Sequence, residues 1–287
     1  MEHLSMKRFF NLKFFAYVGL CGLLIAGGIL AKRKFWDLPK YPLAYKTSLA
    51  NDHLCEKCEM KIPKIIHRIW TQWGPVKKGL SPLYQQFDVD LKKLHPDWQV
   101  MEWDDAKIEE FIKTHHPDFW GTYNHFDTPI KKHDAIRYLV VDHYGGVFIQ
   151  HSMKFMKNMD PLMRGHEAVF FEQSAEGYLL TNGFFAARPH HSVFAQIKEK
   201  LKRRNKFNAQ QATGPYFITG VIRSYIKKQD ASGVKIFSHK QAFPFDWNQK
   251  TKEPFYSQCI LNPNKCHLLF PAAYAFTLWK GEWKNQE

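Results

Sequence analysis

Asp134 and Arg137 are the residues whose types and spacing most directly suggest chemistry. They stand three positions apart in the stretch DAIRYLVVDHYGGVFIQHS. On a helix this spacing puts a carboxylate and a guanidinium on one face, where both can act on one ligand. Open α/β sheets bind ligands outside the carboxyl ends of their strands, so the residues after Ile149 are candidates for the same site. A plain surface ion pair followed by an ordinary turn is the alternative, and spacing alone does not separate the two.

The element that must position this pair is a helix that begins near Thr128 and Pro129. The residues of one face recur at i, i+3, i+4, i+7 and i+8, and they are Ile136, Leu139, Val140, His143 and Tyr144. This period predicts a helix packed along one side. Gly145 suits the left-handed cap after the last turn, and Gly146 leads into a short apolar strand over 147–149.

Strands and helices alternate along the rest of the domain. Strands are expected at 62–70, 98–103, 168–172, 182–187 and 234–238, and helices at 81–94, 104–115, 192–204 and 214–227. This alternation predicts an α/β fold with parallel character in its sheet. The chain has 287 residues, of which 45% are hydrophobic, enough for one sizeable core and too many for intrinsic disorder.

Five further stretches carry a resemblance to a known family. They are IPKIIHRIW at 62–70, DAIRYLVVDHYGGVF at 134–148, the DPL turn at 160–162, NGFFAARPHHSVF at 182–194 and TGP at 213–215. In this order they resemble glycosyltransferase family 32, the DXD-containing sugar-binding glycosyltransferases that include the yeast initiating mannosyltransferases and, remotely, the catalytic domain of the large clostridial glucosylating toxins. The resemblance implies a GT-A fold with a mixed central sheet. It also implies transfer of a hexose from a nucleotide sugar, UDP- or GDP-linked, with retention, to a glycan, lipid or protein acceptor.

The same resemblance assigns roles to residues that match the family's motifs. Asp134 and Arg137 correspond to the pair that binds hydroxyls of the donor sugar, where a planar guanidinium and a carboxylate give directional hydrogen bonds. Trp70 corresponds to the aromatic that stacks on the base, and a core tryptophan is the alternative. Asn182 corresponds to an asparagine that approaches the donor, and a turn-forming asparagine is the alternative.

The chain departs from the family where the Asp-x-Asp motif is expected. Gln150, His151 and Ser152 stand there, and Gln and Ser are poor ligands for the Mn²⁺ or Mg²⁺ that the family uses. Near the end of the chain, Ala275 to Leu278 precede Trp279, whereas relatives carry a histidine before that tryptophan. Both losses fall at the expected metal site, so no metal ligand is assigned, and Gln150 and Ser152 are expected to line the diphosphate.

Three interpretations of this departure stay open. In an active, metal-independent transferase, cations stabilise the leaving diphosphate, and Lys280, Lys154 and Arg188 are the candidates. In a catalytically inactive relative, a pseudoenzyme, the domain binds or scaffolds without turnover. In the third, His151 recruits a transition metal with other ligands. No carboxylate is identifiable as a nucleophile, and Glu172 and Asp246 are only guesses.

The N-terminal part predicts a membrane tether. Residues 14–31 carry no charge over eighteen positions, and a helix of that length spans roughly 27 Å, close to a bilayer core. The sequence therefore divides into a basic tail at 1–13, a transmembrane signal anchor at 14–31, a stalk at 32–60 and a glycosyltransferase-like domain at 61–287. Lysines and arginines flank the anchor on both sides, so the charges do not settle its topology. A Golgi or ER type II single-pass protein is expected if the source is eukaryotic.

Charge and cysteines add two further expectations. The net charge of +14 gathers in the N-terminal flank and in a basic run at 198–206, which indicates a membrane flank and a solvated helix face and no nucleic-acid partner. Cys55, Cys58, Cys259 and Cys266 are compatible with disulfides, with free thiols or with a zinc site.

Overall fold

The computed structural model describes residues 54–71, 79–175, 178–204, 207–228, 231–245 and 254–279. The predicted anchor at 14–31 lies outside these residues, as do Lys280 and Asp246. Within them, every helix is too short or too polar to cross a bilayer.

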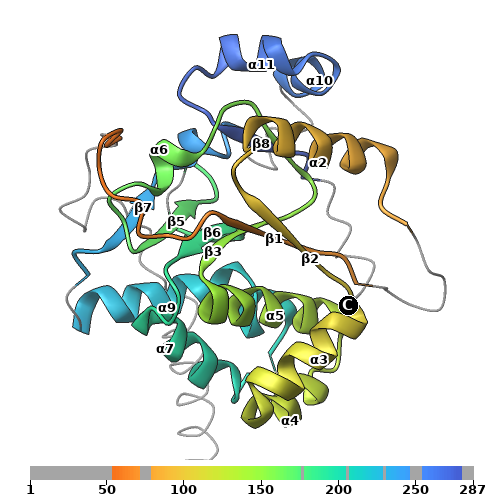
Figure 1. Cartoon of the computed structure of the whole chain (residues 1–287), viewed down its shortest axis with the longest axis vertical. Coiled ribbons are helices and arrows are strands. Elements are labelled where there is room, and N and C mark those ends of the chain that lie inside the picture. Colours follow the sequence, from red (N-terminus) through yellow and green to blue (C-terminus); the bar gives the residue numbers. More distant parts are fainter. Residues whose placement is uncertain are drawn as a thin grey trace, which may run out of the picture. The chain divides into compact units, whose positions relative to one another are not determined.

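A mixed sheet forms the centre of the described part (Figure 1). Six strands follow one another across it in the order β2-β1-β3-β6-β5-β7. Their bounds are β1 Ile65–Ile69, β2 Gln99–Trp103, β3 Gly146–Ile149, β5 Ala168–Glu172, β6 Leu180–Ala187 and β7 Val234–Phe237. β1 runs parallel to β2 and β3, and β5 to β7, whereas β6 is antiparallel to both of its neighbours. The predicted α/β fold with a mixed sheet is confirmed, and each strand expected from the sequence is present.

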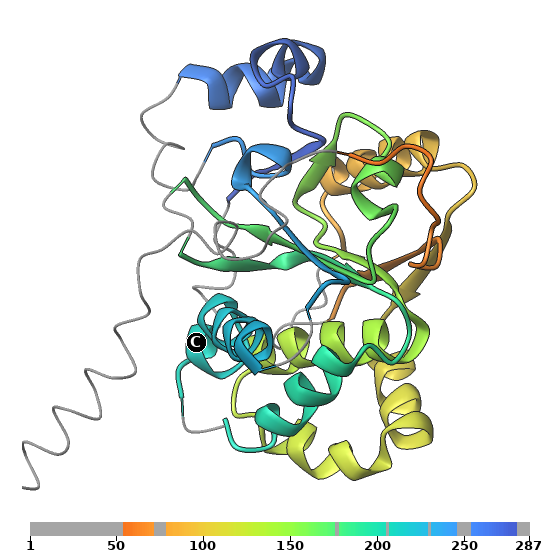
Figure 2. The same cartoon turned by 90° about the vertical axis from the view of Figure 1, so that its left-hand side faces the viewer.

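Helices cover both faces of this sheet. One face carries α3 Asp105–His115, α4 Pro117–His125, α5 Pro129–Tyr144, α7 Ser192–Leu201, α8 Ala209–Ala212 and α9 Pro215–Lys228. The other carries α2 Pro82–Leu94 and the single turn α6 Asp160–Met163 (Figures 1 and 2). Side chains on a strand point alternately to the two faces. Phe148 therefore packs in the core under α5, whereas Val147 and Ile149 pack in the core on the α2 side.

Two glycines join α5 to the sheet. Gly145 caps the helix at φ 66° and donates to the carbonyl of Val141, as predicted. Gly146 has φ 94°, and a Cβ there would lie 2.5 Å from the carbonyl oxygen of Ile65. Only glycine permits this approach of β3 to β1, which explains the Tyr-Gly-Gly sequence.

Two hydrogen bonds of the buried His67 side chain link β1 to β2 and to the turn before β3. Its Nε2–H donates to the carbonyl of Gly145 at 2.8 Å, and its Nδ1 accepts from Trp103 Nε1 at 3.1 Å. Burial lowers the pKa of His67 to about 4, so the imidazole is neutral, in the tautomer that these two bonds require.

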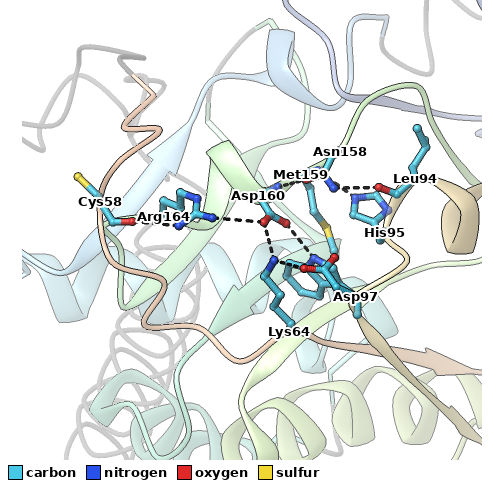
Figure 3. Close-up of polar contacts among 10 residues, drawn as sticks. Cys58, Lys64, Leu94, His95, Asp97, Asn158, Met159, Asp160 and Arg164 are labelled. Carbon is cyan, nitrogen blue, oxygen red and sulfur yellow. Dashed lines mark hydrogen bonds and ion pairs between the residues drawn. The ribbon is translucent and has the colours of Figure 1, made fainter.

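The DPL turn has a structural role at the amino end of β1 (Figure 3). Asp160 accepts from Lys64 Nζ at 2.7 Å and from Trp98 Nε1 at 2.9 Å. Arg164 lies 3.6 Å from the same carboxylate and reaches the carbonyl of Cys58. Asp160 thus fixes α6 to β1 and to the loop after α2.

A second, two-stranded sheet lies beyond the carboxyl end of β3. β4 Met153–Phe155 pairs antiparallel with β8 Ala275–Thr277. Before β8 the chain forms α10 Pro254–Leu261 and α11 Pro263–Leu269. The sequence predicts none of these elements, nor α4. Four of the five cysteines pair locally, Cys55 with Cys58 and Cys259 with Cys266, so disulfides are the alternative that the structure adopts, and none of these four is left as a thiolate for zinc.

Candidate functional site

Asp134 and Arg137 form a buried ion pair on α5. Arg137 Nη2 lies 2.8 Å from Asp134 Oδ1, and the two side chains are only 5% and 6% exposed. The guanidinium also stacks 4.6 Å from the ring centre of Phe148 on β3. The surface ion pair considered from the sequence is therefore not what the structure has, because this pair faces the sheet.

Residues from two other segments meet this pair. Arg137 Nη1 donates to the carbonyl of Asn182 on β6 at 2.7 Å, and the Asn182 side chain lowers the pKa of Asp134. Thr213 of the TGP stretch donates to Asp134 Oδ2 at 3.1 Å, and its carbonyl accepts from Tyr138 at 2.7 Å. Four positions that the sequence singles out separately thus form one polar cluster.

His133 completes the cluster. Arg137 Nη2 donates to His133 Nδ1 at 2.6 Å, which requires an unprotonated nitrogen there. Burial and the neighbouring Arg137 hold the pKa of His133 well below its usual value. Burial raises the pKa of Asp134, and Arg137, Thr213 and Asn182 oppose that shift.

Trp70 lies just past the carboxyl end of β1, beside a second polar group. Its ring meets His151 edge-on, with 5.7 Å between centroids. His151 Nδ1 lies 3.2 Å from Asp88 Oδ2 on α2, and Asp88 is also ion-paired with Arg68. Arg68 is buried and donates from Nη1 to the carbonyls of Ile149 and Gln150, at 3.0 and 3.1 Å. A fixed cation therefore lies directly behind the segment that follows β3.

Gln150 and Ser152 lie together on Thr277. Gln150 Nε2 donates to Thr277 Oγ1 at 3.0 Å, and the Ser152 hydroxyl is 3.1 Å from the same atom. The backbone amide of Leu278 donates to the carbonyl of Ser152 at 3.1 Å. The two places where the sequence departs from the family pattern are thus neighbours in space, joined by the β4–β8 ladder.

Comparison with known proteins identifies the class of site. Residues 84–169 match the family model described as "Glycosyltransferase sugar-binding region containing DXD motif". The resemblance to glycosyltransferase family 32 is confirmed. The chain is 29% identical over 198 residues to inositol phosphoceramide mannosyltransferase 1 of Schizosaccharomyces pombe, covering 64% of this chain and 59% of that protein. It is 31% identical over 181 residues to mannosyl phosphorylinositol ceramide synthase CSH1 of Saccharomyces cerevisiae, covering 61% of this chain and 46% of that protein.

The length of the relatives that is matched and one solved structure complete the comparison. The matched region spans about half the length of the two yeast relatives. A solved structure, PaToxG glycosyltransferase, superposes with a TM-score of 0.44 at 15% identity, over 74% of this chain and 77% of that one. The matched part of the chain is thus similar to the sugar-binding region of glycosyltransferases.

The residues predicted to stand at the family 32 metal position do not fit a divalent metal. Gln150, Ser152 and Thr277 offer an amide and two hydroxyls, and Mn²⁺ and Mg²⁺ prefer carboxylate oxygen. Asp88 is the carboxylate nearest in the hydrogen-bond network, and Arg68 and His151 already hold it. Among the residues that the structure describes, no three His, Cys, Asp or Glu side chains gather as a metal site would require.

The chain's one literal Asp-x-Asp sequence lies elsewhere. Asp88 and Asp90 flank Val89 within α2, where Asp88 is paired as above and Asp90 is ion-paired with Lys154. Both carboxylates therefore serve internal ion pairs. Arg68, Asp88, His133 and Thr277 are the site residues that sequence reasoning missed. Arg68 lies inside a quoted motif, whereas Thr277 carries no signal of its own.

Of the three cations predicted for the diphosphate, the structure describes two, and both are held in ion pairs with carboxylates. Lys154 faces α2, where it binds Asp90 and lies 5.5 Å from the ring centre of Phe87. Arg188 follows the end of β6 that pairs with the start of β3, and it donates to Glu167 at 3.0 Å. Gln150 follows the other end of β3, so the length of that strand separates the Arg188 side chain from the Gln150 side chain. Lys280 lies outside the described residues. Glu172 is buried at the end of β5.

Proposed function

We propose that this protein transfers a hexose from a UDP- or GDP-linked sugar to an acceptor and does so without a metal ion. One observation carries the proposal: Asp134, Arg137, Asn182 and Thr213 meet at the edge of the sheet where β1 and β3 end. Ligands of α/β sheets bind at this edge. One yeast relative is named an inositol phosphoceramide mannosyltransferase and the other a mannosyl phosphorylinositol ceramide synthase, so among glycan, lipid and protein acceptors we favour a lipid.

Each site residue has a role in this proposal. The Asp134 carboxylate and the Arg137 guanidinium orient the sugar through hydroxyl hydrogen bonds, while Asn182 and Thr213 hold the pair in place. Trp70 stacks on the base at the end of β1. Binding the sugar this way positions its anomeric carbon for front-face attack by the acceptor, with retention of configuration.

The leaving diphosphate needs positive charge or hydrogen-bond donors, because negative charge develops there. Gln150, Ser152 and Thr277 supply an amide and two hydroxyls that donate to phosphate oxygens once a ligand displaces their mutual contacts. Arg68, fixed behind the carbonyl of Gln150, supplies a buried cation. These groups take the place of the family's metal in stabilising the diphosphate.

We further propose that the protein is a membrane-bound enzyme with a GT-A fold. The GT-A assignment rests on the family match and on the mixed sheet. Membrane anchoring through 14–31, with the domain in the Golgi or ER lumen, rests on the apolar segment and is compatible with the two disulfides, which form in oxidising compartments.

A catalytically inactive protein is the second candidate. The neutral set of Gln150, Ser152 and Thr277 favours it, because this set lacks the carboxylates that the rest of the family uses. In that case the domain binds a nucleotide sugar or its acceptor and releases no product.

Turnover decides between the two. The full chain in detergent is incubated with UDP- and GDP-hexoses and a phosphoinositol-containing ceramide, in EDTA, and released nucleotide is measured. We expect turnover in EDTA, an α-linked product from an α-linked donor by NMR, and about a hundredfold loss in Ser152→Ala. Ser192→Ala, at the start of α7, is the matched control and should keep full rate. Binding without nucleotide release for every donor and acceptor would favour the inactive protein.

A further inference from the structure

The α10–α11 hairpin projects from the body of the domain on the side of α2 and β8 (Figures 1 and 2). Its two helices are joined by the disulfide between Cys259 and Cys266, and both cysteines are fully buried. They pack with Phe276 and Phe87 in one small core. The hairpin is therefore fixed to the domain through its cysteine-bearing side.

Three leucines of this hairpin are exposed, and two of them lie on the side opposite the cysteines. Leu261 and Leu268 each stand two residues after a buried cysteine, a step of about 200° around a helix, so they point away from the core. They are 85% and 79% exposed, and Leu269 is 38% exposed. Among the described residues, Val89 on α2 is the only other exposed large apolar side chain. Single exposed leucines are common, whereas a group of three on one projecting hairpin marks a contact surface.

The charged side chains of this hairpin and of the hollow beside it are mostly basic. Between 254 and 279 the sequence has no Asp or Glu, and its basic side chains are Lys265 and His267. An open hollow of about 420 Å³ lies between the hairpin and α2, lined in part by Asp90, Lys93, Lys154 and His267. Asp90 is neutralised by Lys154, and neither Lys93 nor Lys265 forms an ion pair with any described residue.

We propose that this face docks on a lipid bilayer that carries anionic headgroups. Leu261, Leu268 and Leu269 enter the interface, and Lys93 and Lys265 lie at the level of the lipid phosphates, with the hollow open to a headgroup. Proteins bind such surfaces by combining exposed apolar side chains with neighbouring lysines. A protein partner fits less well, because the apolar side chains project outward from a narrow hairpin instead of forming a flat patch. The docking does not depend on glycosyl transfer.

An environment-sensitive probe at the tip tests the docking. In the full chain, Cys21→Ser removes the cysteine outside the disulfides, and Leu268→Cys is labelled with a nitrobenzoxadiazole dye. Glu110→Cys, exposed on α3, is the matched control. Each protein is reconstituted into vesicles of phosphatidylcholine alone, or of phosphatidylcholine with an equal part of phosphatidylserine.

We expect the dye at 268 to shift to the blue, and to be quenched by spin-labelled acyl chains, in the phosphatidylserine vesicles, while the dye at 110 stays in water. Lys93→Gln and Lys265→Gln should each weaken docking about fivefold. Three results would overturn the proposal: no shift at 268, an equal shift without anionic lipid, or a shift that rises with protein density at fixed lipid composition, which indicates contact between copies of the chain.

Discussion

Removal of the Asp134 charge separates the structural role of the buried pair from its proposed role in sugar binding. In Asp134→Asn, Arg137 keeps only uncharged partners, the carbonyl of Asn182 and the Nδ1 of His133. Its side chain is 5% exposed, so water does not replace the lost carboxylate. Breaking a buried pair from one side costs about 3–5 kcal/mol, out of a total stability of about 5–15 kcal/mol.

The double variant Asp134→Asn with Arg137→Met removes both charges. The asparagine oxygen still accepts from Thr213, and methionine fills the space over Phe148, so the double variant should recover most of the lost stability. Its affinity for a nucleotide sugar should nevertheless fall about tenfold to a hundredfold, the share of one hydrogen bond to a charged group.

Urea unfolding and calorimetric titration measure the two effects separately. The expected order of stability is wild type, then the double variant, then Asp134→Asn. A single variant as stable as the double would show that the charge is not buried as described. A double variant that binds nucleotide sugar like the wild type would refute the sugar-binding role of the pair.

Three further predictions concern stability. The pKa of His67 is about 4 in the folded protein against about 6.5 unfolded. The contribution of the neutral His67 side chain to the free energy of unfolding is therefore complete above pH 6.5 and is lost as the pH falls toward 4. Unfolding free energy should drop by about 3 kcal/mol over that window, and urea unfolding of His67→Gln should show a correspondingly weaker pH dependence. Replacing Cys259 and Cys266 by serine should cost about 2–3 kcal/mol by opening the loop between them, measured as the drop in unfolding free energy, and an unchanged value would mean that the bond does not form. Gly146→Ala should lower the melting temperature by more than 10 °C, because the added Cβ would meet the Ile65 carbonyl oxygen. Gly121→Ala is the control, because a Cβ at that position meets nothing within 4 Å.

Local pattern was enough to predict the centre of the fold. The α5 helix, its Gly145 cap and the strand after it follow from residues close in sequence, and tertiary packing did not override them. The pairing of Asp134 with Arg137 follows from the i, i+3 spacing. Neither the spacing nor the family resemblance predicted that the pair faces the sheet and is met by Asn182 and Thr213, because these contacts join segments far apart in the chain.

Long-range pairing is what the sequence could not show. Thr277 reaches Ser152 because two three-residue strands pair across more than a hundred positions, and strands so short carry no periodic signal. Lys154 could not be placed because its face of β4 is fixed by that same pairing. Arg188 is near Asn182 in sequence, but an extended strand carries it to the other end of the sheet.

Calorimetric titration of the full chain with UDP- and GDP-hexoses, in EDTA and then in Mn²⁺, tests most directly whether the site binds a donor without a metal. We predict binding of one donor series with the same affinity in both conditions, and loss of that binding in the Asp134→Asn, Arg137→Met double variant. Binding that appears only with Mn²⁺, or that survives in the double variant, would contradict the proposed site.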